Sequence, residues 1–187
     1  KLRKLKLEGN QISDLSFLSP LVALQELDLR NNAIADLTPL QTLSNLQKLN
    51  LARNHIKDLA PLAAGSYPNL AMLDLSYNEI QDLSPLSGCG RLSTLLFAYN
   101  RVEDLTPLEP LAEIRVLNAS GNQFTSVEPL GKLSNLLELD LSYNLLADVS
   151  PLKKLRRLRT LDLTDCSVTQ GELKALRQAL PECDITA

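Results

Sequence analysis

Four acidic side chains near the C-terminal end of the chain are the first candidates for chemistry. Asp140 and Asp162 lie 22 residues apart in similar sequence contexts, and Glu138 and Asp165 accompany them. Carboxylate oxygens are the ligands that calcium prefers in proteins. The sequence predicts, however, that these carboxylates project from rigid strands, with no loop that could wrap around an ion. We therefore expect this acidic zone to attract a basic partner by its charge and not to hold a cation.

The other reactive side chains form no catalytic or metal-binding pattern. His55 is the only histidine and has no nucleophile or glycine-rich phosphate loop beside it, so we expect no enzymatic activity and no cofactor. No CxxC motif, which would indicate a metal site, is formed by the three cysteines, Cys89, Cys166 and Cys183. Cys89 occupies a leucine position and is expected to be buried. A bridge between Cys166 and Cys183 stays open, with reduced thiols as the default.

A basic cluster lies between the last two predicted strands and could suggest an anion site. Its members alternate with Leu155 and Leu158, which occupy core positions, so we interpret the cluster as a solvated face. The cluster consists of Lys153, Lys154, Arg156, Arg157 and Arg159.

The overall charge favours an ordinary interaction protein. With 19 basic and 22 acidic residues the net charge is −3, which is unfavourable for general nucleic-acid binding. No apolar run reaches membrane-spanning length and no signal peptide is visible. We expect a monomer that binds another protein, without nucleic-acid binding or membrane insertion. The chain begins at Lys1 inside a strand pattern, so we expect it to be cut from a longer protein. Its compartment stays open, although reduced cysteines mildly favour the cytoplasm.

One sequence unit, which recurs along the chain, positions all of these residues. Its clearest copy is residues 24–40, LQELDLRNNAIADLTPL, where alternating leucines predict a short strand that ends at an asparagine turn. The leucines of one copy can be buried only by stacking on the next, so the sequence predicts a solenoid with a parallel sheet. Eight turn residues mark the copies, at intervals of 22 residues except for one of 24: Asn10, Asn32, Asn54, Asn78, Asn100, Asn122, Asn144 and Cys166.

The pattern LxxLxLxxN/CxI/L is the leucine-rich repeat signature, and the sequence resembles that family over residues 2–168. The closing DLxPL, seen at Asp36, Asp82 and Asp104, resembles the 22-residue subtype of bacterial internalins and of a regulatory subunit of protein phosphatase 1. The resemblance implies a right-handed, curved α/β solenoid, with a parallel β-sheet on the concave face and short helical turns on the convex face. It also implies that the turn asparagines are structural and bond the backbone of neighbouring turns.

Each repeat is expected to close with a capped helical turn. Recurring aspartates such as Asp36 are expected to bind backbone amides of the turn. A hydroxyl residue and a proline follow, as in Thr38 and Pro39, so we expect the hydroxyl at the cap and the proline in the first helical position. Two extra residues in the fourth copy predict a small bulge that carries Tyr67 on the convex side.

The two ends of the solenoid are predicted to differ. Residues 169–180 contain a capping box, Thr169 with Glu172, and an apolar stripe. These features predict a helical cap in residues 169–187 that is continuous with the eight repeats of residues 1–168. The run LKALRQALPECDI resembles the terminal caps of many bacterial leucine-rich repeat proteins. Nothing comparable precedes the first strand, so we expect an open edge there and a missing N-terminal cap.

Function is expected in the residues that vary, because the repeated ones are occupied with folding. The outward strand positions predict a concave face with a mixed charged zone, an apolar and tyrosine-rich middle and an acidic end. An apolar cluster rimmed by charge is typical of protein-binding surfaces, although single surface leucines are also common. We predict that the partner contacts Met72, Asp74, Tyr77, Thr94, Leu96, Tyr99, Val116, Asn118, Asp140, Tyr143 and Asp162.

Two functional classes follow from this surface. The first is a non-catalytic module that binds a protein partner on its concave face. The second is a sensor or specificity domain of a larger enzyme or signalling protein, including phosphatase regulation. The face has no tryptophan and few aromatic residues, so the sequence favours no particular partner within either class.

Overall fold

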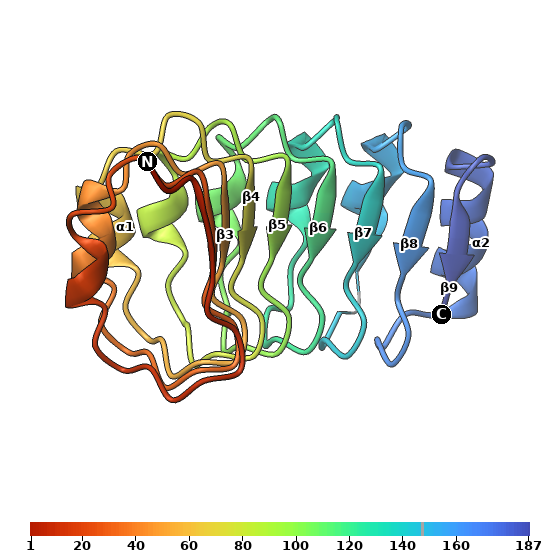
Figure 1. Cartoon of the computed structure of the whole chain (residues 1–187). Coiled ribbons are helices and arrows are strands. Elements are labelled where there is room, and N and C mark those ends of the chain that lie inside the picture. Colours follow the sequence, from red (N-terminus) through yellow and green to blue (C-terminus); the bar gives the residue numbers. More distant parts are fainter. Residues whose placement is uncertain (147) are drawn as a thin grey trace.

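Nine short parallel strands form a single sheet in the computed structural model, which describes residues 1–146 and 148–187 apart from the side chain of Ala64. Each strand pairs with its neighbours in chain order, and Figure 1 shows this sequence from the red N-terminal end to the blue C-terminal end. The strands are β1 (Lys4–Lys6), β2 (Glu26–Asp28), β3 (Lys48–Asn50), β4 (Met72–Asp74), β5 (Thr94–Leu96), β6 (Val116–Asn118), β7 (Glu138–Asp140), β8 (Thr160–Asp162) and β9 (Asp184–Thr186).

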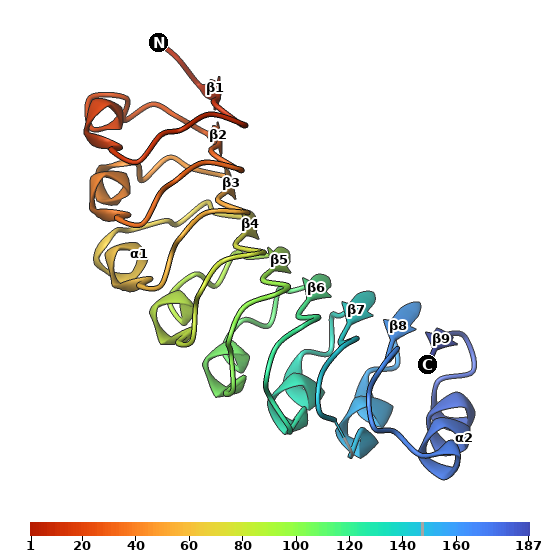
Figure 2. The same ribbon diagram turned by 90° about the horizontal axis from the view of Figure 1, so that it is seen from below.

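Short helices line the opposite side of the molecule. Figure 2 shows the strands on the inner side of an arc and the helices on its outer side. The sheet curves in this direction because a helical turn is wider than the roughly 4.8 Å between paired strands. The predicted solenoid architecture is thus confirmed. The helices are η1 (Ser16–Leu18), η2 (Thr38–Thr42), α1 (Ala60–Ala64), η3 (Ser84–Leu86), η4 (Thr106–Leu108), η5 (Glu128–Lys132), η6 (Ser150–Lys154) and α2 (Gln170–Ala179), and those labelled η are 3₁₀ helices.

The recurring aspartates bind the first backbone amide of each helical turn, as predicted. Asp36 Oδ1 accepts a hydrogen bond of 2.8 Å from the backbone N–H of Thr38, and the hydroxyl of Ser126 does the same at 3.3 Å for Glu128. The prediction that the hydroxyl residue is the cap was wrong. Thr38 is the first helical residue, because the aspartate side chain reaches its amide from two residues upstream. The intervening Leu37 is thereby free to enter the core.

The core is a stack of leucines from the inward side of every strand. Leu27, Leu49, Leu73 and Leu95 align in register across four neighbouring strands and are almost completely buried. Each buried leucine stabilises the fold by about 1.5–3 kcal/mol before the entropy cost of ordering is subtracted. Since no repeat encloses its own leucines, the repeats are stable only as a stack.

The turn asparagines join each repeat to the one before it, as the family resemblance implied. Asn32 Nδ2 donates to the carbonyl oxygens of Leu7 and Leu29, at 3.0 and 2.9 Å. Its Oδ1 accepts from the backbone N–H of Ile12 at 3.0 Å. In the eighth repeat the thiol of Cys166 donates to the carbonyl of Leu141 at 3.2 Å, so the cysteine supplies one of these bonds.

The fourth repeat differs from the others in the way that its two extra residues are used. The helical turn that precedes its strand β4 is the α-helix α1, the third helical turn in chain order, and the ring of Tyr67 behind it is buried, with 6% of its surface exposed. The Tyr67 hydroxyl donates a 2.8 Å hydrogen bond to the carbonyl of Leu40, and burial raises its pKa to about 12. The insertion therefore adds core contacts between the second and third helical turns, where a surface bulge was expected.

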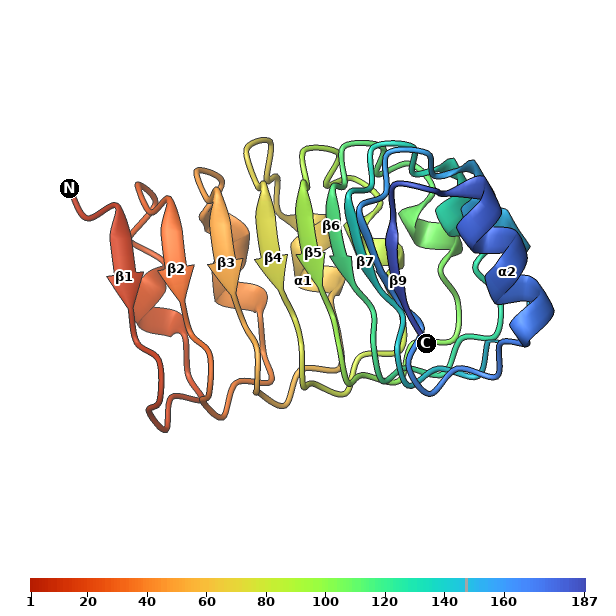
Figure 3. The ribbon, with the colours of Figure 1, turned by 90° about the vertical axis from the view of Figure 1, so that its right-hand side faces the viewer.

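Helix α2 and strand β9 close the C-terminal end. Thr169 and Glu172 form the predicted capping box, and Leu173 and Leu176 are buried against the last repeat. Figure 3 shows α2 and β9 in front of the stacked repeats. Strand β9, which extends the sheet beside β8, was not predicted. None of the helices in the described part of the chain is long and apolar enough to cross a membrane.

The first repeat is less enclosed than those in the middle. The inward residues Leu5 and Leu7 of this repeat are only partly buried. Leu2 is 48% exposed and Val22 is 51% exposed. Leu2 and Val22 line a small hollow at this end of the molecule.

Candidate functional site

Strand pairing places the predicted partner-binding residues in rows across the concave face. The pairing register aligns Met72 with Thr94 and then with Val116. In the next row Asp74, Leu96 and Asn118 lie side by side, and the row continues to Asp140 and Asp162. The structure therefore brings together on one face, across strands β4 to β8, residues that lie up to 90 positions apart in the sequence.

The apolar part of this face is less exposed than the sequence suggested. Met72, Leu96 and Val116 are half-buried, and Ala98 is buried. Side chains on neighbouring strands of a sheet lie close enough to cover one another, so Leu96 is flanked by Asp74 and Asn118. The expectation of an exposed cluster that includes Leu96 needs correction, because the most exposed apolar surface here belongs to the tyrosines.

Tyr77, Tyr99 and Tyr143 form an exposed row along one margin of the concave face, which we call the tyrosine ledge. Their exposed fractions are 42%, 42% and 52%. The rings of Tyr77 and Tyr99 are stacked, with centroids 4.7 Å apart and planes 13° apart. Tyr99 and Tyr143 are 6.5 Å apart and tilted by 35°. The three rings thus make a nearly continuous aromatic surface across four repeats.

The backbone conformation of the ledge is unusual for tyrosine. The three tyrosines have φ angles of 53° to 58°, in the left-handed region that glycine and asparagine adopt most easily. The equivalent position in the other repeats carries Gly9, Asn31, Arg53, Gly121 or Asp165, all with positive φ. A side chain at Gly121 would collide with the Tyr99 ring, because its Cβ would lie 2.7 Å from a ring carbon. Residues in this conformation are held by the surrounding structure, and they cluster at functional sites.

The polar residues of the central row are partly structural. The Oδ1 atom of Asp140 accepts hydrogen bonds from the backbone N–H and the hydroxyl of Ser142, at 3.0 and 2.7 Å. Asp162 binds Thr164 in the same way, and Asn118 Nδ2 donates to the remaining oxygen of Asp140 at 3.0 Å. Sequence analysis missed this role, although the repeated spacing of an Asx residue and a hydroxyl two positions later signals it. These bonds hold the carboxylates in place on the face.

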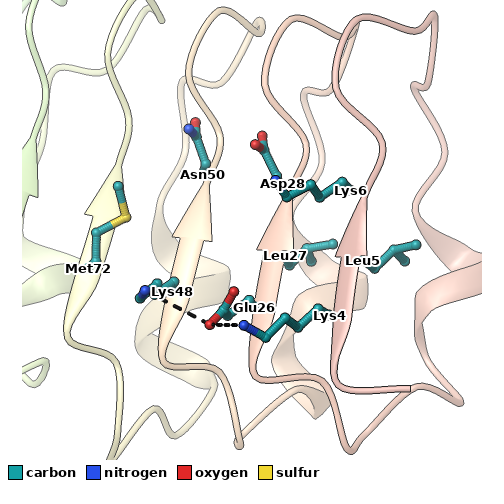
Figure 4. A pocket seen from close by; sticks show the side chains of 9 residues that line it. All are labelled: Lys4, Leu5, Lys6, Glu26, Leu27, Asp28, Lys48, Asn50 and Met72. Atoms are coloured by element: carbon teal, nitrogen blue, oxygen red, sulfur yellow. Dashed lines mark ion pairs between the residues drawn. The ribbon is translucent and has the colours of Figure 1, made fainter. Parts of the chain in front are cut away.

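Three shallow hollows follow one another along the concave face. The first, of about 160 Å³, lies at the basic end, where Glu26 pairs with Lys4 at 3.0 Å and with Lys48 at 3.9 Å (Figure 4). The hydrogen bond from Lys4 lowers the pKa of Glu26. The second hollow, of about 480 Å³, is bordered by the tyrosine ledge. The third, of about 370 Å³, is the acidic one and is lined in part by Glu138, Asp162 and Asp184.

The charge of the face therefore changes sign along the arc. Arg30 and Arg53 line the ledge hollow on its N-terminal side, whereas Asp140 lines it on the other side. The guanidinium of Arg53 lies over the Tyr77 ring, 4.1 Å from its centroid. Desolvation raises the pKa of Tyr99, and Tyr77, Tyr143 and Asp140 add to this shift. The face thus carries lysines and arginines among carboxylates at one end, aromatic rings in the middle and a group of carboxylates at the other end.

The other candidates from the sequence have structural explanations. Within the described ranges, no group of three or more histidine, cysteine or acidic residues is arranged to hold a metal ion. All three cysteines are free, Cys89 is buried, and burial raises the pKa of its thiol. In the basic cluster Lys154 lies 3.5 Å from Glu128 and Arg157 donates to Asn135, as expected for a solvated face.

The turn asparagines, such as Asn32, Asn54 and Asn78, bond each repeat to the one before it and form a column that we call the asparagine ladder. This ladder and the fold define a leucine-rich repeat solenoid, and comparison with known proteins agrees. The profile described as "Leucine Rich repeats (2 copies)" matches residues 1–42, 22–64, 113–154 and 134–177, and the "Leucine rich repeat" profile matches residues 44–102. The chain therefore belongs to the leucine-rich repeat family. No curated protein sequence matches it.

The similar solved structures include proteins of two bacterial species. An internalin, InlF, of Listeria monocytogenes is 28% identical over 99% of this chain and 54% of its own, with a TM-score of 0.93. Internalin C2 of the same species is 36% identical over 90% of this chain and 71% of its own, with a TM-score of 0.81. A leucine-rich repeat protein of Leptospira interrogans is 26% identical over the whole chain and 49% of its own, with a TM-score of 0.91. The chain spans about half the length of the first and third of these proteins.

Proposed function

We propose that this chain is a non-catalytic module that binds a protein partner on its concave face, with the tyrosine ledge at the centre of the contact. Leucine-rich repeats commonly serve as protein–protein interaction modules, and the similar internalins share the whole architecture. Tyrosine is enriched in the energetically dominant residues of protein interfaces, because it supplies a large rigid surface and a polar hydroxyl.

The observation that carries the proposal is the retention of tyrosine in a left-handed backbone conformation. Glycine or asparagine would satisfy the turn at lower cost, as Gly9, Asn31 and Gly121 do. Five of the eight repeats carry another residue there, and three of these five are the ledge tyrosines, beside Arg53 and Asp165. The rings of Tyr77, Tyr99 and Tyr143 remain 42–52% exposed, so burial in the core offsets little of this cost. Contact with a partner provides a reason for their presence.

The test is a comparison of partner capture from cells of the source organism by the unmodified chain and by the double variant Tyr77→Asn/Tyr99→Asn. Asparagine is the matched replacement because Asn31 occupies the equivalent position with φ of 57°. A partner that binds the ledge should lose affinity by at least about 2 kcal/mol, roughly thirtyfold.

Phe17→Ala is the control for the loss of an exposed ring. Phe17 is 45% exposed, similar to the ledge tyrosines, but it belongs to η1 on the convex side. Its removal should leave capture unchanged. Equal capture of every bound protein by the unmodified chain and the double variant would show that the ledge is not the binding surface.

A further inference from the structure

The tyrosine ledge is occupied at one end and open at the other. At its N-terminal end the guanidinium of Arg53 covers Tyr77, which is stacked against Tyr99 on its other side. At the C-terminal end the Tyr99 ring lies over Gly121, which adds no side chain of its own, and Tyr143 is the next ring along the ledge. The N-terminal end of the ledge therefore already binds one guanidinium, that of Arg53. The pair of Tyr99 and Tyr143 at its C-terminal end is available to another group.

The surroundings of the open pair are acidic. Asp140 lines the same hollow as Tyr99 and Tyr143, and the row of turn residues continues beyond Tyr143 to the exposed Asp165. Asp162 lies beside Asp140 on the next strand. Hydrogen bonds from Ser142 and Asn118 hold the Asp140 carboxylate in place. An acidic partner would be repelled here, and an apolar one would desolvate these carboxylates without compensation.

We infer that the partner presents an arginine to this place, within a basic segment that runs towards the acidic end of the face; this inference rests on the proposed function. The guanidinium stacks on the exposed ring of Tyr143 beside Tyr99, and Asp140 and Asp165 neutralise its charge. Arginine suits the site better than lysine because its planar and weakly hydrated group stacks on aromatic rings. The contact between Arg53 and Tyr77, at 4.1 Å, is an example of the same geometry within the chain.

The inference can be tested by nuclear magnetic resonance titration of the full chain with four peptides. All have the same glycine and serine backbone, and they carry three arginines, three lysines, three citrullines or three glutamates at the same places. Citrulline keeps the shape of arginine without its charge. The arginine peptide should shift the ring signals of Tyr99 and Tyr143 and bind at least about fivefold more tightly than the lysine peptide. The citrulline and glutamate peptides should not bind measurably.

Variants of the chain separate stacking from charge. Tyr99→Asn and Tyr143→Asn should each weaken the arginine peptide by at least about fivefold and reduce its advantage over lysine. Asp162→Asn should weaken the arginine and lysine peptides by the same factor, because it changes only the charge. Phe17→Ala should change neither peptide. No binding of the arginine peptide, equal binding of arginine and lysine, or unchanged binding by Tyr99→Asn would overturn the inference.

The outcome is distinguishable from that of the proposed function. If partner capture depends on the ledge tyrosines while the arginine peptide fails, the concave face is the binding surface and the guanidinium assignment is wrong. If the captured partner binds the unmodified chain and the double tyrosine variant equally well, the proposed function is wrong, regardless of the results with the peptides.

Discussion

Replacement of one buried asparagine should show how strongly the asparagine ladder holds the repeats together. Asn100 is 6% exposed and makes three close hydrogen bonds to the backbone, besides a longer one of 3.4 Å from Nδ2 to the carbonyl of Ala98. Its Nδ2 donates to the carbonyls of Leu75 and Phe97, both at 3.0 Å, and its Oδ1 accepts from the N–H of Ile80 at 2.9 Å. Asn100→Ala removes all three bonds and adds no group that could replace them.

The expected loss follows from the cost of leaving these backbone groups without partners. An unsatisfied buried donor or acceptor costs about 1–3 kcal/mol, and partial relaxation reduces the sum, so Asn100→Ala should lower the free energy of unfolding by about 3–5 kcal/mol. Asn10 occupies the same place in the first repeat but is exposed, and it bonds only the carbonyls of Leu7 and Glu8. Water can replace those bonds, so Asn10→Ala should cost less than about 1 kcal/mol.

Urea denaturation followed by circular dichroism measures both variants. Asn100→Cys is a third point on the same scale, because Cys166 supplies one of the three bonds in the eighth repeat, and its cost should fall between the other two. Equal losses for Asn10→Ala and Asn100→Ala, or a loss below about 1 kcal/mol for both, would refute the assignment of the ladder as a principal source of cohesion between repeats.

Four further substitutions test other parts of the structure. Leu95→Asp should unfold the protein by placing a charge in the core, whereas Leu96→Asn should change the melting temperature little, because the neighbouring strands already carry polar residues at that position. Hydrogen bonds from the Thr38 hydroxyl and amide lower the pKa of Asp36. Its contribution to stability should therefore be complete above the ordinary pKa of 3.8 and decline as the pH falls below it, and Asp36→Asn should flatten the dependence of melting temperature on pH in that range. Tyr67→Phe should lower the free energy of unfolding by about 1 kcal/mol, because the hydrogen bond to the carbonyl of Leu40 is lost. In an alkaline absorbance titration, the variant should lack the tyrosine that ionises only near pH 12.

Most of the architecture was predictable because it depends on local alternation. The leucines at 27 and 29 alternate with polar residues, and that spacing alone assigns them to one face of a strand. Contacts that depend on distances between repeats were not predictable in this way. The position of the Tyr67 ring is determined by its bond to Leu40, which is 27 residues away and in another repeat. Strand β9, with the sequence DIT, lacks the leucine spacing of the repeats, and its pairing with β8 depends on how α2 returns the chain to the sheet.

Sequence spacing predicted that the candidate residues lie on one face, but it did not predict their detailed geometry. Sequence spacing placed Tyr77, Tyr99 and Leu96 on one face, yet it did not indicate that the leucine would be half-buried by its neighbours. The left-handed backbone conformation of the tyrosines could have been inferred, because glycine occupies the equivalent position of the repeat at Gly9 and Gly121. The stacking of the rings was not visible, since it depends on side-chain rotations that the sequence does not specify.

The asparagine ladder has a direction. Each asparagine oxygen accepts the amide of the preceding repeat, as Asn32 does for Ile12 and Asn54 for Ile34. Suppose that a duplicated copy is inserted between two repeats. Its asparagine oxygen would accept the amide of the repeat before it, and the asparagine oxygen of the repeat after it would accept its own amide. Growth or loss of whole copies thus leaves no amide without an acceptor inside the stack. The arc can lengthen or shorten during evolution in steps of one strand, and the reach of its concave face can change without a new fold.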